Sequence, residues 1–317
     1  MDIYRLLVGA FGRRNDLYGR DDTDCYRLFN SDGDGIGGLS IDRYGRYLLL
    51  QCFNKRAGAM AASMGDALEK ALGCLPFMVE GIVMKDRKKE ENCGDIATAR
   101  RSVLLRGNAP PDDYRVMQNG MTVCVDLMKG QNTGVFLDMR EARKALASFY
   151  IPGGRMLNLF CYTGLFSVHA LRHGMGHALN VDLSAAVLKK ARENYRLNGL
   201  PLDERDFIRG DALEWIGRMK KKAALFSYAV IDPPTFARHR RRNFSVRKHF
   251  RPSLTGLSPL VPEGLVFTAV NLHSVGYEEY LSYHPRGWKL EWFGNESSDF
   301  ARSGEPYLKA GLWKTGF

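Results

Sequence analysis

The second half of the chain alternates short apolar runs with amphipathic stretches, in units of twenty to thirty residues. From about residue 138 onward, each apolar run ends in polar residues and is followed by a stretch with helical spacing of its apolar positions. This order predicts an α/β fold with a doubly wound, Rossmann-like sheet, in which helices cover both faces of parallel strands. The expected strands are 155–160, 177–182, 206–211, 226–232 and 264–270, and the expected helices are 139–150, 165–174, 184–199 and 212–220.

The first half has a different pattern, with strand-like alternation on both sides of one amphipathic segment. It predicts a hairpin that turns at Tyr44-Gly45, then a helix and two further strands. These elements are expected at 39–53 (hairpin), 58–73 (helix), and 77–84 and 97–106 (strands). The pattern is typical of a small α+β module.

A linker and a second hairpin are expected between the two halves. Residues 107–113, GNAPPDD, have the proline, glycine and aspartate content of a linker, and the stretch behind them predicts a hairpin that turns at Asn119-Gly120. We therefore predict a small N-terminal α+β domain over 1–110, with a possible role in RNA or substrate binding, and the catalytic α/β domain over 111–317.

A glycine-rich stretch in the first half imitates two ligand-binding motifs. Gly33, Gly35 and Gly38 have the G-x-G-x-x-G spacing of a dinucleotide loop, but the residues that follow alternate like a strand, whereas such a loop must lead into a helix. The same stretch resembles the start of an EF-hand calcium loop, yet Ile41 stands where a bidentate glutamate is needed. We expect a turn here, with neither nucleotide nor calcium.

The composition narrows the class of protein. With 317 residues, 45% apolar and 26% charged, the chain is neither disordered nor of low complexity. No stretch approaches the roughly 18 consecutive apolar residues of a membrane span, so a cytoplasmic protein without membrane contact is expected. The six cysteines form no C-x-x-C pair and no metal is expected; none follows Cys161. The oligomeric state is left open.

The surplus positive charge is concentrated in one segment. The net charge is +11, and residues 238–251 hold seven Lys or Arg, two His and no acid. A solvated basic surface is the plain alternative. Because the run begins two residues after Phe236, beside the expected substrate pocket, we interpret it as a grip on the phosphate backbone of RNA. The predicted RNA-binding residues are Arg238, Arg240, Arg241, Arg242, Arg247 and Lys248.

Polar residues close four of the predicted strands of the second half. The first ends in the stretch 158–164, where Gly164 opens a helix and lets a ligand approach the backbone. Asp182 closes the second, as expected of an acid that accepts ribose hydroxyls, and Asp211 closes the third, where it can accept from an adenine amine. Each acid alone is more often a helix N-cap. Phosphate-cradling glycines are missing here, so the sequence favours S-adenosylmethionine, a nucleoside without pyrophosphate.

The fourth strand ends in Asp232-Pro233-Pro234-Thr235-Phe236. Two prolines fix the backbone and remove two donors, so the carbonyls and the Asp232 carboxylate become rigid acceptors for a planar amino or imino group. Phe236 is suited to stack on a base. The alternative is a strand that two prolines simply terminate. We predict Asp232, Pro233 and Phe236 as the catalytic set.

Five ordered motifs resemble those of a known family. GQNTGVFLDMREAR (130–143), LNLFCYTGLFSVHA (157–170), VDLS (181–184), ENYRLNGL (193–200) and DPPTF (232–236) together resemble the class I S-adenosylmethionine-dependent methyltransferases that act on large-subunit ribosomal RNA. The products of that family include 5-methylcytosine and 7-methylguanine. The stretches 32–51 and 297–313 look similar to relatives as well.

The resemblance implies roles for individual residues. It implies that the turn after the first strand lines the methionine part of the cofactor, that Asp182 and Leu183 hold the ribose, and that Asp232 with Pro233 lies beside the transferable methyl. The implied cofactor-binding residues are Phe136 and Asp138, which close over the site, and Asn158, Phe160, Tyr162, Thr163, Gly164, Asp182, Leu183, Asp211, Ala212 and Asp232.

One departure from the family affects the target atom. Members that make 5-methylcytosine carry a cysteine after the strand that follows DPP, where this chain has FTAVNLHSV (267–275). Carbon 5 of cytosine needs a thiolate adduct, whereas guanine N7 already has a lone pair. We therefore favour a base nitrogen, guanine N7 above all. The alternatives are cytosine-5 methylation, a small-molecule or protein methyltransferase, and an RNA-binding protein without turnover.

Overall fold

The computed structural model describes residues 2–87, 102–234, 236–238 and 243–316. The chain divides into two compact units, which are described separately. The first comprises Met1–Arg140 with Ser297–Gly304, and the second Glu141–Glu296 with Glu305–Phe317. The domain boundary expected between residues 110 and 111 stays a prediction.

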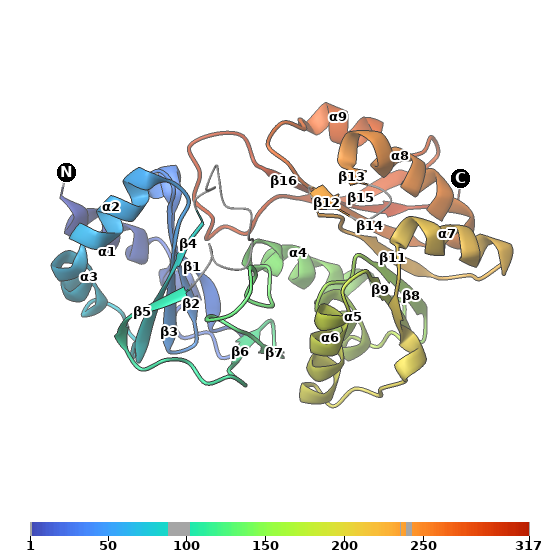
Figure 1. Ribbon diagram of the computed structural model, residues 1–317. Helices are drawn as coiled ribbons and strands as arrows, with labels where there is room; N and C mark the ends of the chain where they lie inside the picture. Colours follow the sequence, from blue (N-terminus) through green and yellow to red (C-terminus); the bar gives the residue numbers. More distant parts are fainter. Residues whose placement is uncertain (1, 88–101, 235, 239–242, 317) are drawn as a thin grey trace. The chain divides into compact units, whose positions relative to one another are not determined.

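The first unit is built on a five-stranded sheet with the order β1-β2-β3-β4-β5, in which β3 and β4 are parallel and the other neighbours antiparallel. Helices α1 to α3 cover one face (Figure 1), and their apolar residues, such as Leu7 and Leu68, share a core with the sheet residues Leu28 and Leu50. The bounds are Ile3–Gly12 (α1), Cys25–Asn30 (β1), Leu39–Tyr44 (β2), Tyr47–Cys52 (β3), Lys55–Ser63 (α2), Gly65–Leu72 (α3), Gly81–Asp86 (β4), Ser102–Gly107 (β5), Arg115–Gln118 (β6) and Met121–Cys124 (β7).

Two predictions for this unit need correction. The single helix expected over 58–73 is two helices: Asn54 caps α2 through its side-chain oxygen, and the backbone leaves helical geometry at the buried Met64, just before Gly65, a poor helix former. The hairpin turn lies one residue later than expected, because Tyr44 pairs with Tyr47.

The other turn predictions are confirmed. Asn119 and Gly120 both have left-handed backbones, with φ of 50° and 72°, as a two-residue hairpin turn requires. The glycine-rich stretch forms a turn that leads into strand β2 and not into a helix, with Gly35 and Gly38 at positive φ. The expected strand 97–106 lies partly outside the described residues.

A late segment of the chain completes the first unit. The carboxylate of Asp299 is buried, and it accepts from the Arg140 guanidinium at 2.8 Å and from the Arg27 backbone N–H at 2.7 Å. Its carbonyl accepts from the buried Arg14, which also forms an ion pair with the buried Asp34 at 2.7 Å. Ser297–Gly304 is therefore tied into this unit by charged groups that water does not reach.

The second unit contains a seven-stranded sheet with the order β10-β9-β8-β11-β14-β16-β15 (Figure 1). The five strands from β10 to β14 are parallel, β16 is antiparallel to β14, and β15 is antiparallel to β16. Helices α5 and α6 lie on one face, and α7 and α8 on the other. The bounds are Arg140–Ala145 (α4), Arg155–Leu159 (β8), Leu165–Arg172 (α5), His177–Asp182 (β9), Ala185–Leu197 (α6), Phe207–Arg209 (β10), Ala212–Lys221 (α7), Tyr228–Ile231 (β11), Phe236–Arg238 (β12), Asn243–Ser245 (β13), Val246–Leu257 (α8), Leu265–Asn271 (β14), Tyr277–Ser282 (α9), Lys289–Gly294 (β15) and Leu308–Lys314 (β16).

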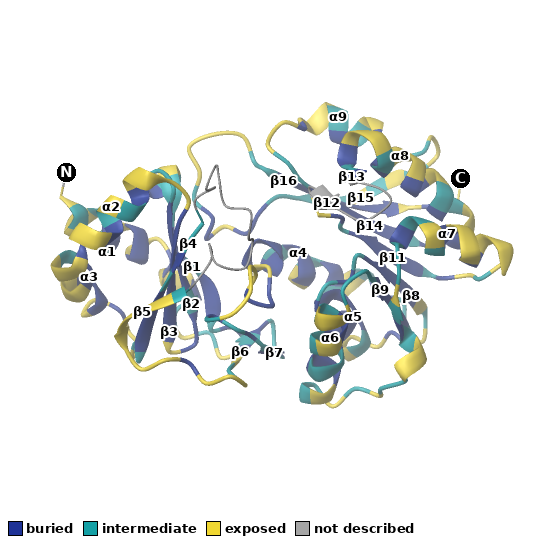
Figure 2. Ribbon diagram, viewed as in Figure 1, coloured by how far each residue is buried: buried dark blue, intermediate teal, exposed yellow. Residues whose placement is uncertain are grey.

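The central strands of this sheet are buried on both faces, and Figure 2 shows them in the buried class. Every residue of β11 is buried, from Tyr228 to Ile231. Strands covered by helices on both faces are expected to be continuously apolar, which is the pattern the sequence shows. The predicted doubly wound α/β architecture is confirmed.

Two absences hold within the part of the chain that the structure describes. No helix there is both long and apolar enough to cross a membrane. No group of three or more His, Cys, Asp or Glu side chains there is placed to hold a metal ion.

Candidate cofactor site

The topology of the second sheet defines where a ligand is expected. Strand β8 is the first of the sheet in sequence, and it lies between β9 and β11 in space. The strand order therefore reverses beside β8. In open parallel sheets, ligands bind at such a reversal, beyond the carboxyl ends of the strands. Asp182 is the last residue of β9, and most of the other cofactor residues predicted from the sequence directly follow β8, β9, β10 or β11.

The turn between β8 and α5 has an unusual backbone. Phe160 and Tyr162 have positive φ, at 56° and 50°, which is rare for bulky residues. Gly164 follows at 75° and is the N-cap of α5, with no side-chain hydrogen bond to the helix end. A Cβ on Gly164 would lie in tight contact with the Ala191 Cβ, at 3.1 Å, and the positive φ would strain any other residue. Strain of this kind is concentrated at binding sites.

Asp182, at the end of β9, supports this turn. One carboxylate oxygen accepts from the Tyr162 backbone N–H at 3.0 Å, and the other accepts from the Ser184 N–H at 2.9 Å. Helix α6 is capped by Ser184, so capping does not explain Asp182. Burial raises the pKa of Asp182, and the backbone donors oppose that rise. An acceptor fixed in this way is suited to a pair of vicinal hydroxyls.

Asp211 does act as a cap. Its Oδ1 atom accepts from the backbone N–H groups of Leu213 and Glu214 at 2.9 and 3.1 Å, and so it begins helix α7. The neighbouring Gly210 donates its N–H to the carbonyl of Asp182 at 3.0 Å. The third strand end is thereby joined to the second.

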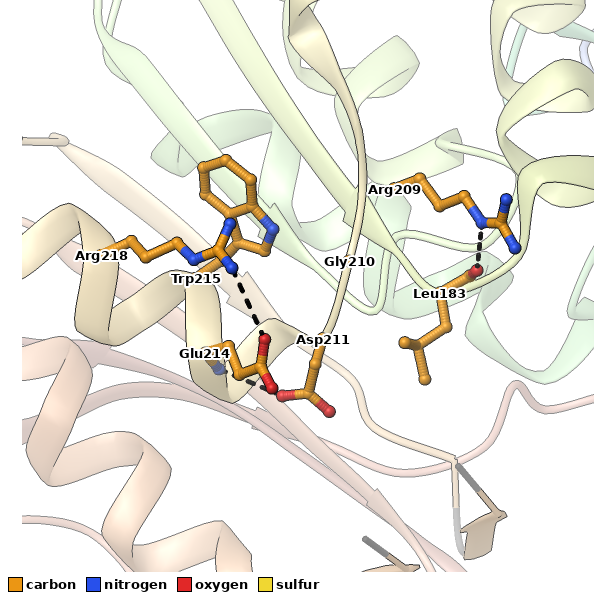
Figure 3. Close-up of a pocket in the computed structure, with 7 residues that line it drawn as sticks. All are labelled: Leu183, Arg209, Gly210, Asp211, Glu214, Trp215 and Arg218. Atoms are coloured by element: carbon orange, nitrogen blue, oxygen red, sulfur yellow. Dashed lines mark hydrogen bonds and ion pairs between the residues drawn. The ribbon is translucent and has the colours of Figure 1, made fainter. Parts of the chain in front are cut away.

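A hollow of about 290 Å³ lies beside these strand ends. Its lining residues are Leu183, Arg209, Gly210, Asp211, Glu214, Trp215 and Arg218. Figure 3 shows Leu183 and Arg209 on one side of the Gly210-Asp211 turn, and Trp215 with Arg218 on the other. The Arg218 guanidinium stands 5.0 Å from the centre of the Trp215 ring. Four of its seven lining residues are charged, namely Arg209, Asp211, Glu214 and Arg218, and the Trp215 indole adds a flat aromatic surface that suits a planar base.

The sequence prediction missed Trp215 and Arg218. The signal was present, because both lie in the first two turns of the helix that follows a strand-closing acid, and they are spaced three residues apart. A Cβ on Gly210 would fall 2.2 Å from the indole nitrogen of Trp215, so the indole packs directly on that glycine.

Asn158, Thr163 and Ala212 are buried in this unit. The Asn158 amide donates to the Ser167 hydroxyl at 2.9 Å, and the Thr163 carbonyl accepts from the Asn194 amide at 2.9 Å. These bonds hold the β8 turn against α5 and α6. The direct contacts with a cofactor that were expected of these residues stay predictions.

The fourth strand end carries Asp232, which is partly buried, and Pro233, which is buried. Beyond them, β12 and β13 pair as an antiparallel hairpin. The side chains of Phe236 and Arg238, and Arg240, Arg241 and Arg242 entirely, lie outside the described residues.

The two remaining residues of the predicted RNA-binding set, Arg247 and Lys248, differ from each other. Lys248 is exposed. Arg247 forms a two-bond ion pair with Glu279, at 2.8 and 3.1 Å, and also donates to the Ser274 carbonyl. This pair lowers the pKa of Glu279 to about 2. Arg247 is therefore less available to RNA than its sequence context suggests.

Phe136 and Asp138 belong to the first unit. Phe136 is exposed, whereas Asp138 is buried and its carbonyl accepts from the Ser297 N–H at 2.9 Å. That these two residues close over the cofactor stays a prediction.

Comparison with known proteins agrees with this geometry. The sequence model of a family described as S-adenosylmethionine-dependent methyltransferase matches residues 99–288. The chain belongs to the S-adenosylmethionine-dependent methyltransferases. The predicted enzyme family and its cofactor are thereby confirmed.

Individual relatives are similar over most of the chain. It is 33% identical over 266 residues to ribosomal RNA large subunit methyltransferase I of Photobacterium profundum, covering 83% of this chain and 64% of that protein. It is 30% identical over 284 residues to Bacillus subtilis YwbD, named as a candidate ribosomal RNA large subunit methyltransferase, covering 89% of this chain and 70% of that one. The chain thus spans about two thirds of the length of these relatives.

A solved structure is similar over nearly the whole fold. SMU.776, a candidate methyltransferase in complex with S-adenosylhomocysteine, is 25% identical with a TM-score of 0.89, covering 99% of this chain and 81% of that one.

Proposed function

We propose that this protein transfers a methyl group from S-adenosylmethionine to a base nitrogen of large-subunit ribosomal RNA, with guanine N7 as the favoured atom. The observation that carries the proposal is the joined set of strand ends, in which Asp182 fixes the strained β8 turn and Gly210 closes onto Asp182. The names of the curated relatives support ribosomal RNA as the substrate.

The side chains present fit the cofactor. Asp182 offers carboxylate oxygens to the ribose, and the hollow bounded by Leu183 and Trp215 accommodates the adenine, beside the Asp211 carboxylate. The bare N-terminus of α5 at Gly164 leaves backbone N–H groups for the methionine carboxylate. When bound, S-adenosylmethionine supplies an electrophilic methyl group on a sulfonium.

The reaction at a nitrogen needs little chemistry from the chain. Guanine N7 carries its own lone pair, so alignment with the methyl group and exclusion of water are sufficient. The rigid Asp232-Pro233 segment is proposed to accept a hydrogen bond from the amino or imino edge of the base, and Phe236 to stack on it. Asp232 thus acts in binding and orientation.

Cysteine chemistry is disfavoured at this site. No cysteine follows Cys161 in the sequence, and Cys161 itself is 5% exposed. Burial, with a smaller contribution from Asp182, raises the pKa of this thiol well above its usual value. A thiol that stays protonated is a poor nucleophile, so cytosine-5 methylation lacks the adduct it requires.

RNA binding is assigned to the basic run, with Arg240, Arg241 and Arg242 as the principal phosphate contacts. Each contact with a phosphate releases a counterion from the RNA, so the affinity for RNA falls as the salt concentration rises. Because Glu279 neutralises Arg247, the substitution Arg247→Ala is expected to change the salt dependence less than Arg240→Ala does. A cytoplasmic location is proposed with this substrate, since ribosomal RNA is found there in bacteria such as those of the curated relatives.

The test is transfer of labelled methyl from S-adenosylmethionine to ribosomal RNA from a strain that lacks the gene. We expect label in 7-methylguanine after nuclease digestion, and none with Asp232→Ala. Label in 5-methylcytosine would overturn the nitrogen assignment. Label only in protein or small molecules, without competition by RNA, would overturn the substrate class. If Asp232→Ala left the cellular effect of the gene unchanged, a binding protein without turnover would be the better description.

A further inference from the structure

Helix α6 turns a polar side chain toward the core of the second unit. Leu188, Ala191 and Tyr195 are buried, as expected of a helix face that packs on a sheet. Asn194 lies on the same face and is 0% exposed. It belongs to the motif 193–200, to which the proposed function assigns no role. A buried amide is costly unless it is hydrogen-bonded, so the partners of Asn194 indicate what it does.

One partner of Asn194 is a backbone group of the turn between β8 and α5 (residues 160–164, the cofactor turn). The Asn194 Nδ2 atom donates to the Thr163 carbonyl at 2.9 Å. The N–H of the same peptide unit belongs to Gly164, and it donates to the Cys161 carbonyl at 2.9 Å. Asn194 and Cys161 therefore hold both polar groups of this peptide unit.

This peptide unit sets the start of helix α5. Gly164 is the N-cap of α5, with φ of 75°, and its carbonyl accepts the first bond of the helix, from the Val168 N–H at 2.9 Å. The first N–H groups of a helix have no partner inside the helix and point out of its N-terminus. A rotation of the Thr163–Gly164 peptide would change the conformation of the N-cap and redirect these donors.

Two side chains from different elements thus fix the cofactor turn. Asp182, at the end of β9, accepts from the Tyr162 N–H at 3.0 Å, and Asn194, on α6, donates to the Thr163 carbonyl. In the proposed function Asp182 also binds the ribose, whereas Asn194 is fully buried and acts on the turn. Removal of Asp182 would therefore affect two parts of the cofactor, and removal of Asn194 only the part that the turn binds.

We propose that Asn194 is a positioning residue for the methionine end of S-adenosylmethionine. Its amide fixes the peptide unit that precedes α5, so that the N–H groups at the start of α5 are oriented for the methionine carboxylate before it binds. The inference rests on the proposed function, since it takes the N-terminus of α5 as the place of that carboxylate. Adenine and ribose are assigned to other strand ends, so their binding does not depend on Asn194.

The experiment compares two ligands that differ at the methionine end. S-adenosylhomocysteine carries the amino-acid chain, and methylthioadenosine keeps the adenine, the ribose and the sulfur but has a methyl group in place of that chain. Both dissociation constants are measured by calorimetry for the wild type and for each variant. In the wild type we expect S-adenosylhomocysteine to bind about tenfold more tightly or better, because its carboxylate gains charge-assisted hydrogen bonds at the helix N-terminus.

Two variants remove the donor of Asn194. Asn194→Leu has a similar volume, and we expect it to weaken S-adenosylhomocysteine binding roughly tenfold, the equivalent of about one hydrogen bond, and methylthioadenosine binding by less than about twofold. Asn194→Ser should give the same pattern, because its hydroxyl can bond to a carbonyl of its own helix but is too short to reach Thr163. Asp182→Asn, which removes a charged partner of the ribose, should instead weaken the binding of both ligands.

Thr315→Val is the matched control. Thr315 is 1% exposed, and like Asn194 it donates to a backbone carbonyl, that of Val261, while it accepts from the Gly264 N–H at 2.9 Å. Gly264 directly precedes β14, so this group lies at the amino ends of the parallel strands, away from the proposed cofactor edge. The control should lose stability in urea, as Asn194→Leu does, and keep the wild-type ratio of the two dissociation constants.

Each outcome bears on one of the two proposals. A wild type that bound both ligands equally would overturn the placement of the methionine carboxylate, and with it the role of Asn194. A wild-type ratio in Asn194→Leu or Asn194→Ser would overturn the role of Asn194 alone, as would an equal loss for both ligands or a changed ratio in Thr315→Val. If Asn194→Leu failed to fold, Asn194→Ser would decide. Absence of methyl transfer to RNA would overturn the proposed substrate class and leave this inference standing.

Discussion

Two strand-to-helix turns at the same edge of the second sheet are built in opposite ways. The turn after β10 is relaxed and closed by a side chain, because Asp211 caps helix α7 through two backbone N–H groups. The turn after β8 has three residues at positive φ, and its helix α5 begins without a side-chain cap. The chain thus caps the following helix with a side chain at one turn and leaves the N-terminus of the following helix without a side-chain cap at the other. Strain together with an open helix end distinguishes the proposed binding turn from the structural one.

The largest expected difference between the two turns appears when one methyl group is added to the glycine of each turn. Gly164→Ala places a Cβ at φ of 75° and 3.1 Å from Ala191, so affinity for S-adenosylhomocysteine should fall by roughly 10- to 100-fold. Gly210→Ala places a Cβ 2.2 Å from the indole nitrogen of Trp215, so this side chain has to move, but the backbone of Gly210 does not have a positive φ, and the loss of affinity should be smaller. Calorimetry of both variants checks the difference, and equal losses would contradict the contrast between the turns. Adding Trp215→Leu should relieve the clash in the second variant.

The second largest effect on cofactor affinity is expected from the acids that support the two turns, and the two acids should differ in it. In Asp182→Asn one of the two backbone N–H groups faces an amide NH2 in place of an acceptor, and the ribose loses a charged partner, so we expect roughly 10- to 100-fold weaker S-adenosylhomocysteine binding. Asparagine is as good an N-cap as aspartate, so Asp211→Asn should fold normally and lose less than about tenfold. If Asp211→Asn weakened binding more than Asp182→Asn did, the assignment of the ribose to Asp182 would be wrong.

The pH dependence of cofactor binding should report Asp182. Because burial raises its pKa, this carboxylate takes up a proton at a higher pH than an ordinary aspartate, and the protonated form is a weaker acceptor. Affinity for S-adenosylhomocysteine is therefore expected to be highest above that raised pKa and to fall as pH decreases through it, by up to about tenfold per pH unit. Asp211→Asn should keep this dependence and Asp182→Asn should flatten it. A profile unaltered by Asp182→Asn would assign the titration to another group.

The smallest expected effect concerns the fold. Asp211→Ala removes the α7 cap and should lower the free energy of unfolding by about 1 kcal/mol in urea, whereas Asp211→Asn should stay within a few tenths. No corresponding loss of stability is expected at the N-terminus of α5, because this helix has no side-chain cap to remove. A large loss with Asp211→Asn would mean that the carboxylate has a structural role beyond capping.

The strand ends were predictable, and their backbone was not. Apolar runs closed by polar residues located Asp182, Asp211 and Asp232 correctly at the ends of β9, β10 and β11 or just beyond, since parallel strands repeat one simple pattern. The positive φ of Phe160 and Tyr162 has no signal in residue type, because bulky side chains adopt it only under tertiary constraint. The sequence also gave no means to separate Asp182, which supports a turn, from Asp211, which caps a helix.

Side-chain pairing limited the other predictions. A run of cations in a sequence does not show which of them already has a partner, and the partner of Arg247 is Glu279, 32 residues later in the chain. Five of the seven residues that line the hollow are not among the predicted cofactor residues, namely Arg209, Gly210, Glu214, Trp215 and Arg218, because the sequence around a strand-closing acid does not by itself show which residues face a ligand. The break at Met64 in the first unit lies just before Gly65, a poor helix former inside an otherwise helical pattern.

The return of Ser297–Gly304 to the first unit limits how this protein can be divided. A fragment that stops at Arg140 would lack Asp299, so the guanidinium of Arg140 would lose its buried carboxylate and Arg14 would lose a carbonyl acceptor. Synthesis on the ribosome therefore has to reach Ser297–Gly304 before the first unit can finish folding. Until then, the nascent N-terminal half would be a natural client for chaperones.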